Sequence, residues 1–235
     1  MNPTLVRAFL LQRLTSPMRL GLLFLVTIFP LGGVAIMGSL TVLAGVAGSI
    51  AMILAAGAIG QDVSSGTLQL LLVRPVTRPS YLVSRWLATV LATTVILAAL
   101  LALGSGAMIL RGTPPNSIEV VRMLAEGVFT AAGQSAVLIM FSTLAGGLGD
   151  VGLWFGSMIA LQMLTLGAQF KGWTSATRML GELNGVLTPE LKLMWLTQGM
   201  SPPWFAIVSY ASTVTLVLAI GITRLNRREI SYAAD

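Results

Sequence analysis

The sequence predicts an all-α membrane protein with six transmembrane helices, an interfacial helix at the N-terminus and a short external helical segment between spans five and six. Of the 235 residues, 55% are hydrophobic and 9% are charged, and the mean hydropathy is +0.88. Soluble domains average about 25% charged residues, so the bilayer must be the solvent of this chain. Long uncharged stretches separate the charged residues, and each stretch can hold a helix of about 20 residues, the length that crosses a bilayer.

These uncharged stretches give the positions of the spans. The first lies between Arg19 and Asp62 and is long enough for two helices, with a short uncharged turn near Gly38. The predicted spans cover residues 20–38, 41–60, 86–110, 127–147, 151–170 and 203–223. Only short connections remain, so we expect a single transmembrane domain over residues 1–235.

An amphipathic segment precedes the first span. Over residues 3–17, apolar residues recur at helical spacing with polar residues between them: Leu5, Val6, Phe9, Leu10 and Leu14 against Arg7, Gln12 and Arg13. This pattern predicts a helix that lies in the membrane interface, and the alternative is a simple polar lead-in to the first span. We expect no removable signal peptide, because the apolar run that follows is of full span length.

A second helix outside the membrane is predicted within residues 171–202. Thr188 suits the cap position, Pro189 the first helical position and Glu190 the first turn. The apolar edge of this helix would consist of Leu191, Met194 and Trp195. Such a segment can dip into the outer leaflet before the last span begins.

The distribution of Lys and Arg orients the chain. Six spans place both termini on one side of the membrane, and that side holds nine of the 14 basic residues, namely Arg7, Arg13, Arg19, Arg74, Arg78, Arg85, Arg224, Arg227 and Arg228. Because cytoplasmic loops carry an excess of Lys and Arg, we expect both termini in the cytoplasm and the protein in the cytoplasmic membrane. The basic residues are scattered at the ends of apolar runs, which argues against a nucleic-acid partner.

Several kinds of chemistry are excluded by composition. The chain has no cysteine and no histidine, which removes disulfides, thiolate or imidazole metal sites and Ser/His or Cys/His nucleophiles. Neither of its two lysines lies in a phosphate-binding loop. We therefore expect no catalytic residue, metal or cofactor in this chain. Ion-coupled transport is not expected either, because such transporters keep ionisable residues at the centres of their spans.

Three glutamines are the strongest polar groups predicted at membrane depth: Gln134, Gln162 and Gln169. Each amide needs a hydrogen-bond partner in hydrocarbon. Bonding between helices is the favoured interpretation, and lining a substrate path is the alternative.

The connection over residues 61–85 carries the most specific pattern. Ser64 and Ser65 can cap a short helix that Pro75 would end. The ordered elements of the pattern are Gln61, Asp62, Gly66, Thr67, Leu68, Leu71, Leu72, Pro75, Arg78, Tyr81 and Arg85. This order resembles the type 2 ATP-binding-cassette (ABC) exporter permeases, which place an acidic residue, Gly-Thr or Gly-Ser, Leu-Leu, Pro and Arg between spans two and three. Asp62 stands where that family has a Glu cluster, and Ser84-Arg85 where it has Gly-Lys.

The resemblance implies a coupling helix that sits in a cleft on a separate nucleotide-binding ATPase subunit. Leu68, Leu71 and Leu72 would form its apolar contact, with Asp62 and Arg78 as polar flanks. ATP and Mg would bind in the partner, and its hydrolysis would rock the spans between inward and outward openings. A second permease chain, expected to be a copy of this one, would complete the path among the membrane lipids.

Three alternatives remain open at this point. The connection can be a plain link between two spans. The chain can be the substrate-binding membrane subunit of a vitamin uptake system, which calls for a deep polar pocket. It can also be an intramembrane lipid-modifying enzyme, which calls for clustered carboxylates, whereas the eight acidic residues here are dispersed.

Overall fold

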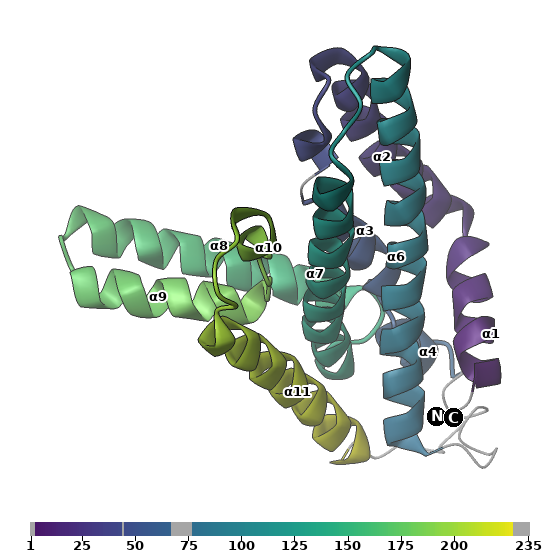
Figure 1. Cartoon of the computed structure of the whole chain (residues 1–235). Helices are drawn as coiled ribbons and strands as arrows, with labels where there is room; N and C mark the ends of the chain where they lie inside the picture. Colours follow the sequence, from purple (N-terminus) through teal and green to yellow (C-terminus); the bar gives the residue numbers. More distant parts are fainter. Residues whose placement is uncertain (1–2, 44, 67–76, 228–235) are drawn as a thin grey trace.

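The computed structural model describes residues 3–43, 45–66 and 77–227. Every regular element in these ranges is a helix, and six segments are long and apolar enough to cross a membrane (Figure 1). The prediction of an all-α protein with six candidate spans is therefore confirmed. The second span, Leu40–Ser64, is made of three shorter helices.

The elements follow one another along the chain without a strand in the described ranges. They are α1 (Pro3–Leu14), α2 (Pro17–Met37), η1 (Leu40–Leu43), α3 (Val46–Ala55), α4 (Gly60–Ser64), α6 (Arg78–Leu110), α7 (Ser117–Leu144), α8 (Gly149–Phe170), α9 (Thr174–Leu187), α10 (Met194–Gln198) and α11 (Trp204–Arg227). Helices α3, α6 and α7 form the centre, α1 packs on α6, and α11 packs along α7.

The third span begins earlier than the predicted range 86–110. The side chain of Thr77 accepts a hydrogen bond from the backbone N–H of Ser80 at 3.4 Å and so caps α6 at its start. The prediction started the span only after the charge of Arg85. In the structure that charge is buried inside the helix bundle, where it is paired with Asp62.

The fourth span likewise begins before the predicted range 127–147. Asn116 caps α7, because its side chain accepts a hydrogen bond from the N–H of Ile118 at 3.0 Å. Three charged residues, Glu119, Arg122 and Glu126, then lie inside the helix, and Arg122 pairs with Glu126 one turn later at 2.9 Å. The prediction relied on uncharged stretches, so it excluded this turn of the helix, in which the two opposite charges pair.

The external segment differs from its prediction. A longer helix, α9, precedes the predicted one, and residues 188–193 are not helical, so the expected start at Thr188 is wrong. The carbonyl oxygen of Pro189 packs against Gly133 on α7, where an added Cβ would lie 2.4 Å from it. The N–H of Leu193 donates to Glu126 at 2.7 Å. One hydrogen bond and one packing contact with α7 thus hold this non-helical segment, and the short helix α10 begins only afterwards.

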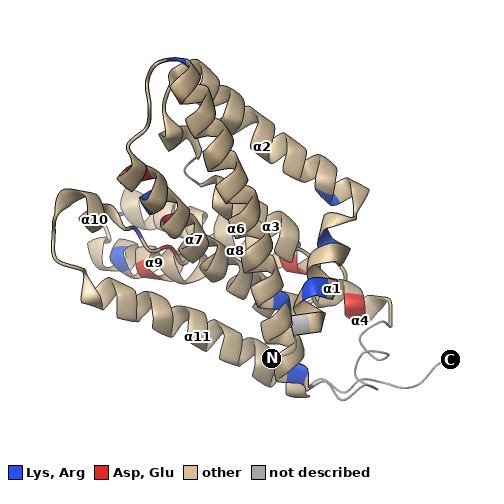
Figure 2. Ribbon diagram, turned by 45° about the vertical axis from the view of Figure 1, so that its right-hand side comes forward, with Lys and Arg blue, Asp and Glu red and all other residues tan. Residues whose placement is uncertain are grey.

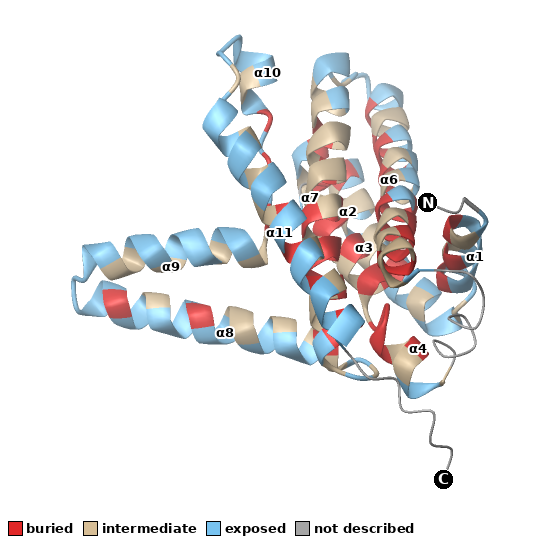
Figure 3. Ribbon diagram, turned by 90° about the horizontal axis from the view of Figure 1, so that it is seen from below, coloured by how far each residue is buried: buried red, intermediate tan, exposed pale blue. Residues whose placement is uncertain are grey.

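Helices α8 and α9 form a hairpin that extends away from the other helices (Figure 1). Figure 3 shows that the surface of both helices is mostly exposed. Within α8, Asp150, Leu161 and Ala168 are the buried residues, although the helix is apolar over most of its length. A single copy of the chain therefore leaves most of the surface of the fifth span exposed.

Candidate functional site

The second span is broken near its end. Helix α3 stops at Ala55, α4 starts at Gly60, and residues 56–59 form turns in which Gly57 has a φ of +63°. A break frees backbone N–H and C=O groups, and each such group costs several kcal/mol in an apolar environment unless it finds a partner. Side chains from other helices supply those partners here, and they form the candidate site.

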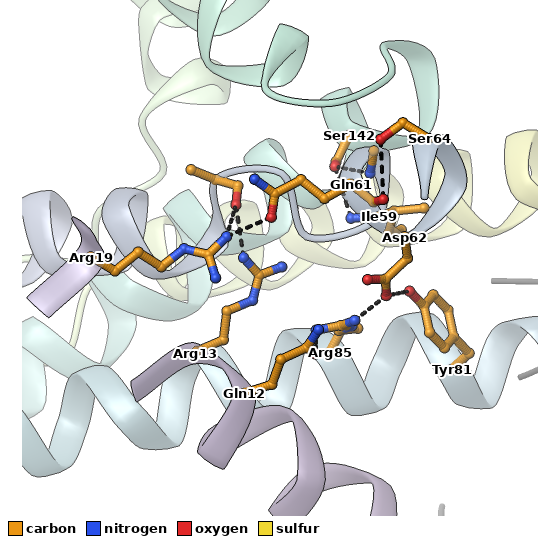
Figure 4. Close-up of polar contacts among 12 residues, drawn as sticks. Gln12, Arg13, Arg19, Ile59, Gln61, Asp62, Ser64, Tyr81, Arg85 and Ser142 are labelled. Carbon is orange, nitrogen blue, oxygen red and sulfur yellow. Dashed lines mark hydrogen bonds and ion pairs between the residues drawn. The ribbon is translucent and has the colours of Figure 1, made fainter. Parts of the chain in front are cut away.

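Two arginines bind the free carbonyl at the break. The carbonyl oxygen of Ala56 accepts hydrogen bonds from Arg13 of α1 at 2.8 Å and from Arg19 of α2 at 3.3 Å (Figure 4). The same nitrogen of Arg19 donates to Gln61 at 2.7 Å. Burial, together with the positive charges of Arg85 and Arg19, lowers the pKa of Arg13 to about 9. This end of the bundle therefore carries crowded positive charge.

Two side chains accept from the free N–H groups. Asp150, at the start of α8, accepts from the N–H of Gly57 at 2.7 Å. The hydroxyl oxygen of Ser142 on α7 accepts from the N–H groups of Ile59 and Gly60, both at 2.9 Å. Asp150 and Ser142 are fully buried. The break is thereby joined to the connection between the fourth and fifth spans.

A buried ion pair lies beside the break. Asp62 of α4 pairs with Arg85 of α6 and accepts a hydrogen bond from the hydroxyl of Tyr81 (Figure 4). Arg85 also donates to Gln12 of α1 at 3.0 Å, and its guanidinium lies 3.8 Å from the centre of the Phe9 ring. Asp62 is 4% exposed and Arg85 2%. The ionic cluster, as we call Asp62, Tyr81 and Arg85, thus joins α1, α4 and α6.

The structure turns the predicted polar flanks of the coupling segment inward. The resemblance implied that Asp62 flanks the contact with the ATPase. Its carboxylate is instead buried in the ionic cluster and does not reach the surface. Arg78 donates to the carbonyl oxygens of Leu225 and Asn226, both at 2.9 Å, and so caps the end of α11. Gln61 is bonded to Arg19, and Gly66, with a φ of +70°, closes the described part of the loop. Thr67, Leu68, Leu71, Leu72 and Pro75 lie outside the described residues.

The three glutamines fall into two groups. Gln134 on α7 packs against Gly48 of α3, where an added Cβ would lie 2.6 Å from the amide oxygen. It therefore lies between two helices, and its hydrogen bond to another helix remains a prediction. Gln162 and Gln169 are exposed on α8, and their side-chain amides make no hydrogen bond with the described part of the chain. Within one copy, they do not join helices.

Sequence reasoning missed most of the partners of the break. Arg13, Ser142 and Asp150 come from three different segments and meet only in the folded chain. One signal was present, since Asp150 is the single charge in a glycine-rich turn between two apolar stretches. Figure 2 shows that charged residues gather around α1 and α4 in the folded chain, whereas the middle of α2 and of α11 is uncharged. Among residues 3–43, 45–66 and 77–227, no group of acidic side chains could hold a metal ion.

Fold and site together define a multi-pass integral membrane protein whose second span is broken and held by buried charged and polar side chains. The model of the family DUF2705, described as a protein of unknown function, matches residues 6–231, and the chain belongs to this family. No curated protein matches the chain. The family match includes all six candidate spans.

Proposed function

We propose that this chain is the membrane-spanning permease subunit of an ABC-type exporter and that a separate ATPase subunit drives it. The observation that carries the proposal is the way the connection between spans two and three is fastened. The segment that resembles the exporter permeases leaves the bundle beside Asp62 and returns to it beside Arg85. One buried ion pair therefore holds both ends of the segment.

This fastening suits the transmission of force. A push on residues 67–76 would reach α4 and α6 together, because the ionic cluster couples them. From α4 it would pass through the break to Ser142 on α7 and Asp150 on α8, and through Arg78 to the end of α11. Rigid movement of packed helices about such contacts is a common form of conformational switching in proteins.

The distribution of charge supports an orientation with this segment in the cytoplasm. The side that holds the segment and both ends of the chain carries nine basic residues, against five on the other side. An excess of Lys and Arg marks the cytoplasmic side of a membrane protein. An ATPase in the cytoplasm would then meet the segment directly in the cytoplasmic membrane.

The exposed surface of α8 supports the proposal that the permease consists of two copies of the chain. An amide without a partner in hydrocarbon costs several kcal/mol, and Gln162 and Gln169 have none within the described chain. A Cβ added at Gly156 would meet nothing within 4 Å, so another backbone can approach there closely. A second copy would supply both the missing contacts and the other wall of a path.

Leu71→Asp tests the proposed contact with the ATPase. We expect a gene for a P-loop ATPase beside the gene for this chain, and the two proteins are co-expressed and purified in lipid. We expect the substitution to reduce co-purified ATPase and lipid-dependent ATP hydrolysis at least about tenfold, because a charge replaces an apolar contact. The matched control is Leu196→Asp on α10, 46% exposed and on the opposite side of the membrane by span count. Equal association for wild type and both variants would contradict the proposal.

Gln162→Cys tests the pairing of two copies. The chain has no cysteine of its own, so each introduced thiol reports alone. We expect oxidation in native membranes to produce a disulfide-linked dimer through α8. The control is Leu216→Cys on α11, where the residue is 60% exposed but no unpaired amide requires a partner. Cross-linking at Leu216→Cys that equals that at Gln162→Cys would argue against a specific pair through α8.

A further inference from the structure

A cavity of about 630 Å³ lies between α2, α3 and the start of α8. Its walls are mainly apolar and include Met18, Leu22, Met52, Ile53 and Phe155. A second hollow of about 530 Å³ continues it along the same two helices, and the two share Val26 and Ser49. We call the two together the α2–α3 groove.

The groove has the length of one membrane leaflet. It follows α2 from Met18 to Pro30, which corresponds to about 18 Å at the helical rise of 1.5 Å per residue. The hydrocarbon core of a bilayer is about 30 Å thick, so one leaflet measures roughly half of that. Only Leu23 and Val34 of α2 are buried, so this helix presents most of its surface to the lipid. A single extended acyl chain therefore matches the groove in length and polarity.

One end of the groove is polar and positively charged. Arg19 and Gln61 line it there, and no acidic residue does. Arg19 uses one nitrogen, Nη2, to bind Gln61 and the carbonyl of Ala56. Its other two nitrogens make no hydrogen bond with the described part of the chain, so they can still donate to a ligand. A guanidinium suits a phosphate group, because its planar donors match two phosphate oxygens.

The surrounding charges favour an anion at this end. Arg13 and Arg19 converge on the same carbonyl oxygen, and Arg85 lies close by. Of the nearby carboxylates, Asp62 is already paired with Arg85, and Asp150 accepts from Gly57 and Val151. The pKa of Arg13 is lowered mainly by burial and then by the positive charges of Arg85 and Arg19. A bound anion would offset the repulsion between these positive charges.

We infer that the α2–α3 groove binds one anionic phospholipid of the bilayer. Arg19 and Gln61 hold the headgroup phosphate, and the apolar walls between α2 and α3 hold an acyl chain. Two features select this occupant: the positive end has no acidic lining residue, and the apolar length ends at that charge. A free anion would make no use of the apolar walls. The site does not depend on the proposed ATPase partner, so each proposal can fail without the other.

The test measures lipid bound to the purified full chain in neutral detergent by native mass spectrometry. We expect phosphatidylglycerol to bind more tightly than phosphatidylethanolamine, whose headgroup has no net charge. We also expect inorganic phosphate, added in excess, to leave the bound phosphatidylglycerol in place. Displacement by phosphate, or equal binding of the two lipids, would overturn the assignment to an anionic phospholipid.

Two variants with matched controls locate the site. Arg19→Gln should weaken binding of phosphatidylglycerol about tenfold, because a hydrogen bond to a charged group is lost. Arg7→Gln, an exposed arginine on α1, should leave it unchanged. Ser49→Trp should block the groove without touching the charge, whereas Leu216→Trp on exposed α11 should not. Undiminished binding in both Arg19→Gln and Ser49→Trp would overturn the proposal. So would a disulfide between two copies of Ser49→Cys, because a second copy would then occupy the groove.

Discussion

Arg85→Met is expected to lower the free energy of unfolding by about 3–5 kcal/mol, because it leaves the carboxylate of Asp62 buried without its counter-charge. Arg85 is 2% exposed and Asp62 4%, so water cannot replace the lost partner. Methionine fills a similar volume, which keeps a cavity from adding to the effect. The measurement is chemical or thermal unfolding of the purified protein in detergent. Arg178→Met is the control: the ion pair of Arg178 with Glu182 is exposed, so we expect a loss of less than about 1 kcal/mol.

The double variant Asp62→Asn, Arg85→Met separates loss of charge balance from loss of packing. Removing both charges is often neutral or even stabilising for a buried pair. We therefore expect the double variant to recover most of the stability that Arg85→Met loses. The stacking of Arg85 on Phe9 and its hydrogen bond to Gln12 are lost in both. A double variant as unstable as the single one would show that these contacts with α1, rather than the ion pair, hold the cluster together.

Ser142→Ala is expected to destabilise the protein by about 2–4 kcal/mol. One hydroxyl oxygen accepts from two backbone N–H groups, those of Ile59 and Gly60, and both become unsatisfied in the variant. Each buried donor that loses its acceptor costs about 1–3 kcal/mol. Unfolding of purified protein in detergent measures the loss.

Ser135→Ala is the matched control for this prediction. Ser135 lies on the same helix and is equally buried, but its hydroxyl only donates, to the carbonyl oxygens of Ala131 and Ala132 in the preceding turn. Its removal leaves no backbone donor without an acceptor, so we expect a loss below about 1 kcal/mol. If the two substitutions cost the same, the break in the second span does not rely on Ser142.

Sequence reasoning found the six spans because the length of an apolar stretch is a local property. It placed the starts of the third and fourth spans too late, because it could not see that Asp62 neutralises Arg85 or that Glu126 neutralises Arg122. It also missed the break in the second span. The glycines there are a weak local signal, and the groups that make the break tolerable lie far away in the chain. Asp150 is 93 residues from Gly57, and only folding brings them together.

The exposed position of α8 could not be read from the sequence either. Apolar length predicts that a helix enters the membrane, but it does not say whether protein or lipid surrounds it. Gln162 and Gln169 were therefore expected to join helices, and within a single chain they do not. Gln134 differs from them, because Gly48 lets its amide lie against α3.

The separation between Gly57 and Asp150 also has a consequence for biosynthesis. A ribosome adds about 5–20 residues per second, so the 93 residues between the two take about 5–20 s to synthesise. During that interval the first spans can already have entered the membrane, while the N–H of Gly57 still lacks its final acceptor. The hydrogen bonds of Arg78 to the end of α11 form later still, across 147 and 148 residues. The second span therefore completes its folding only after the start of the fifth has been made, and a truncated chain that ends before α8 leaves the break open for quality-control proteases.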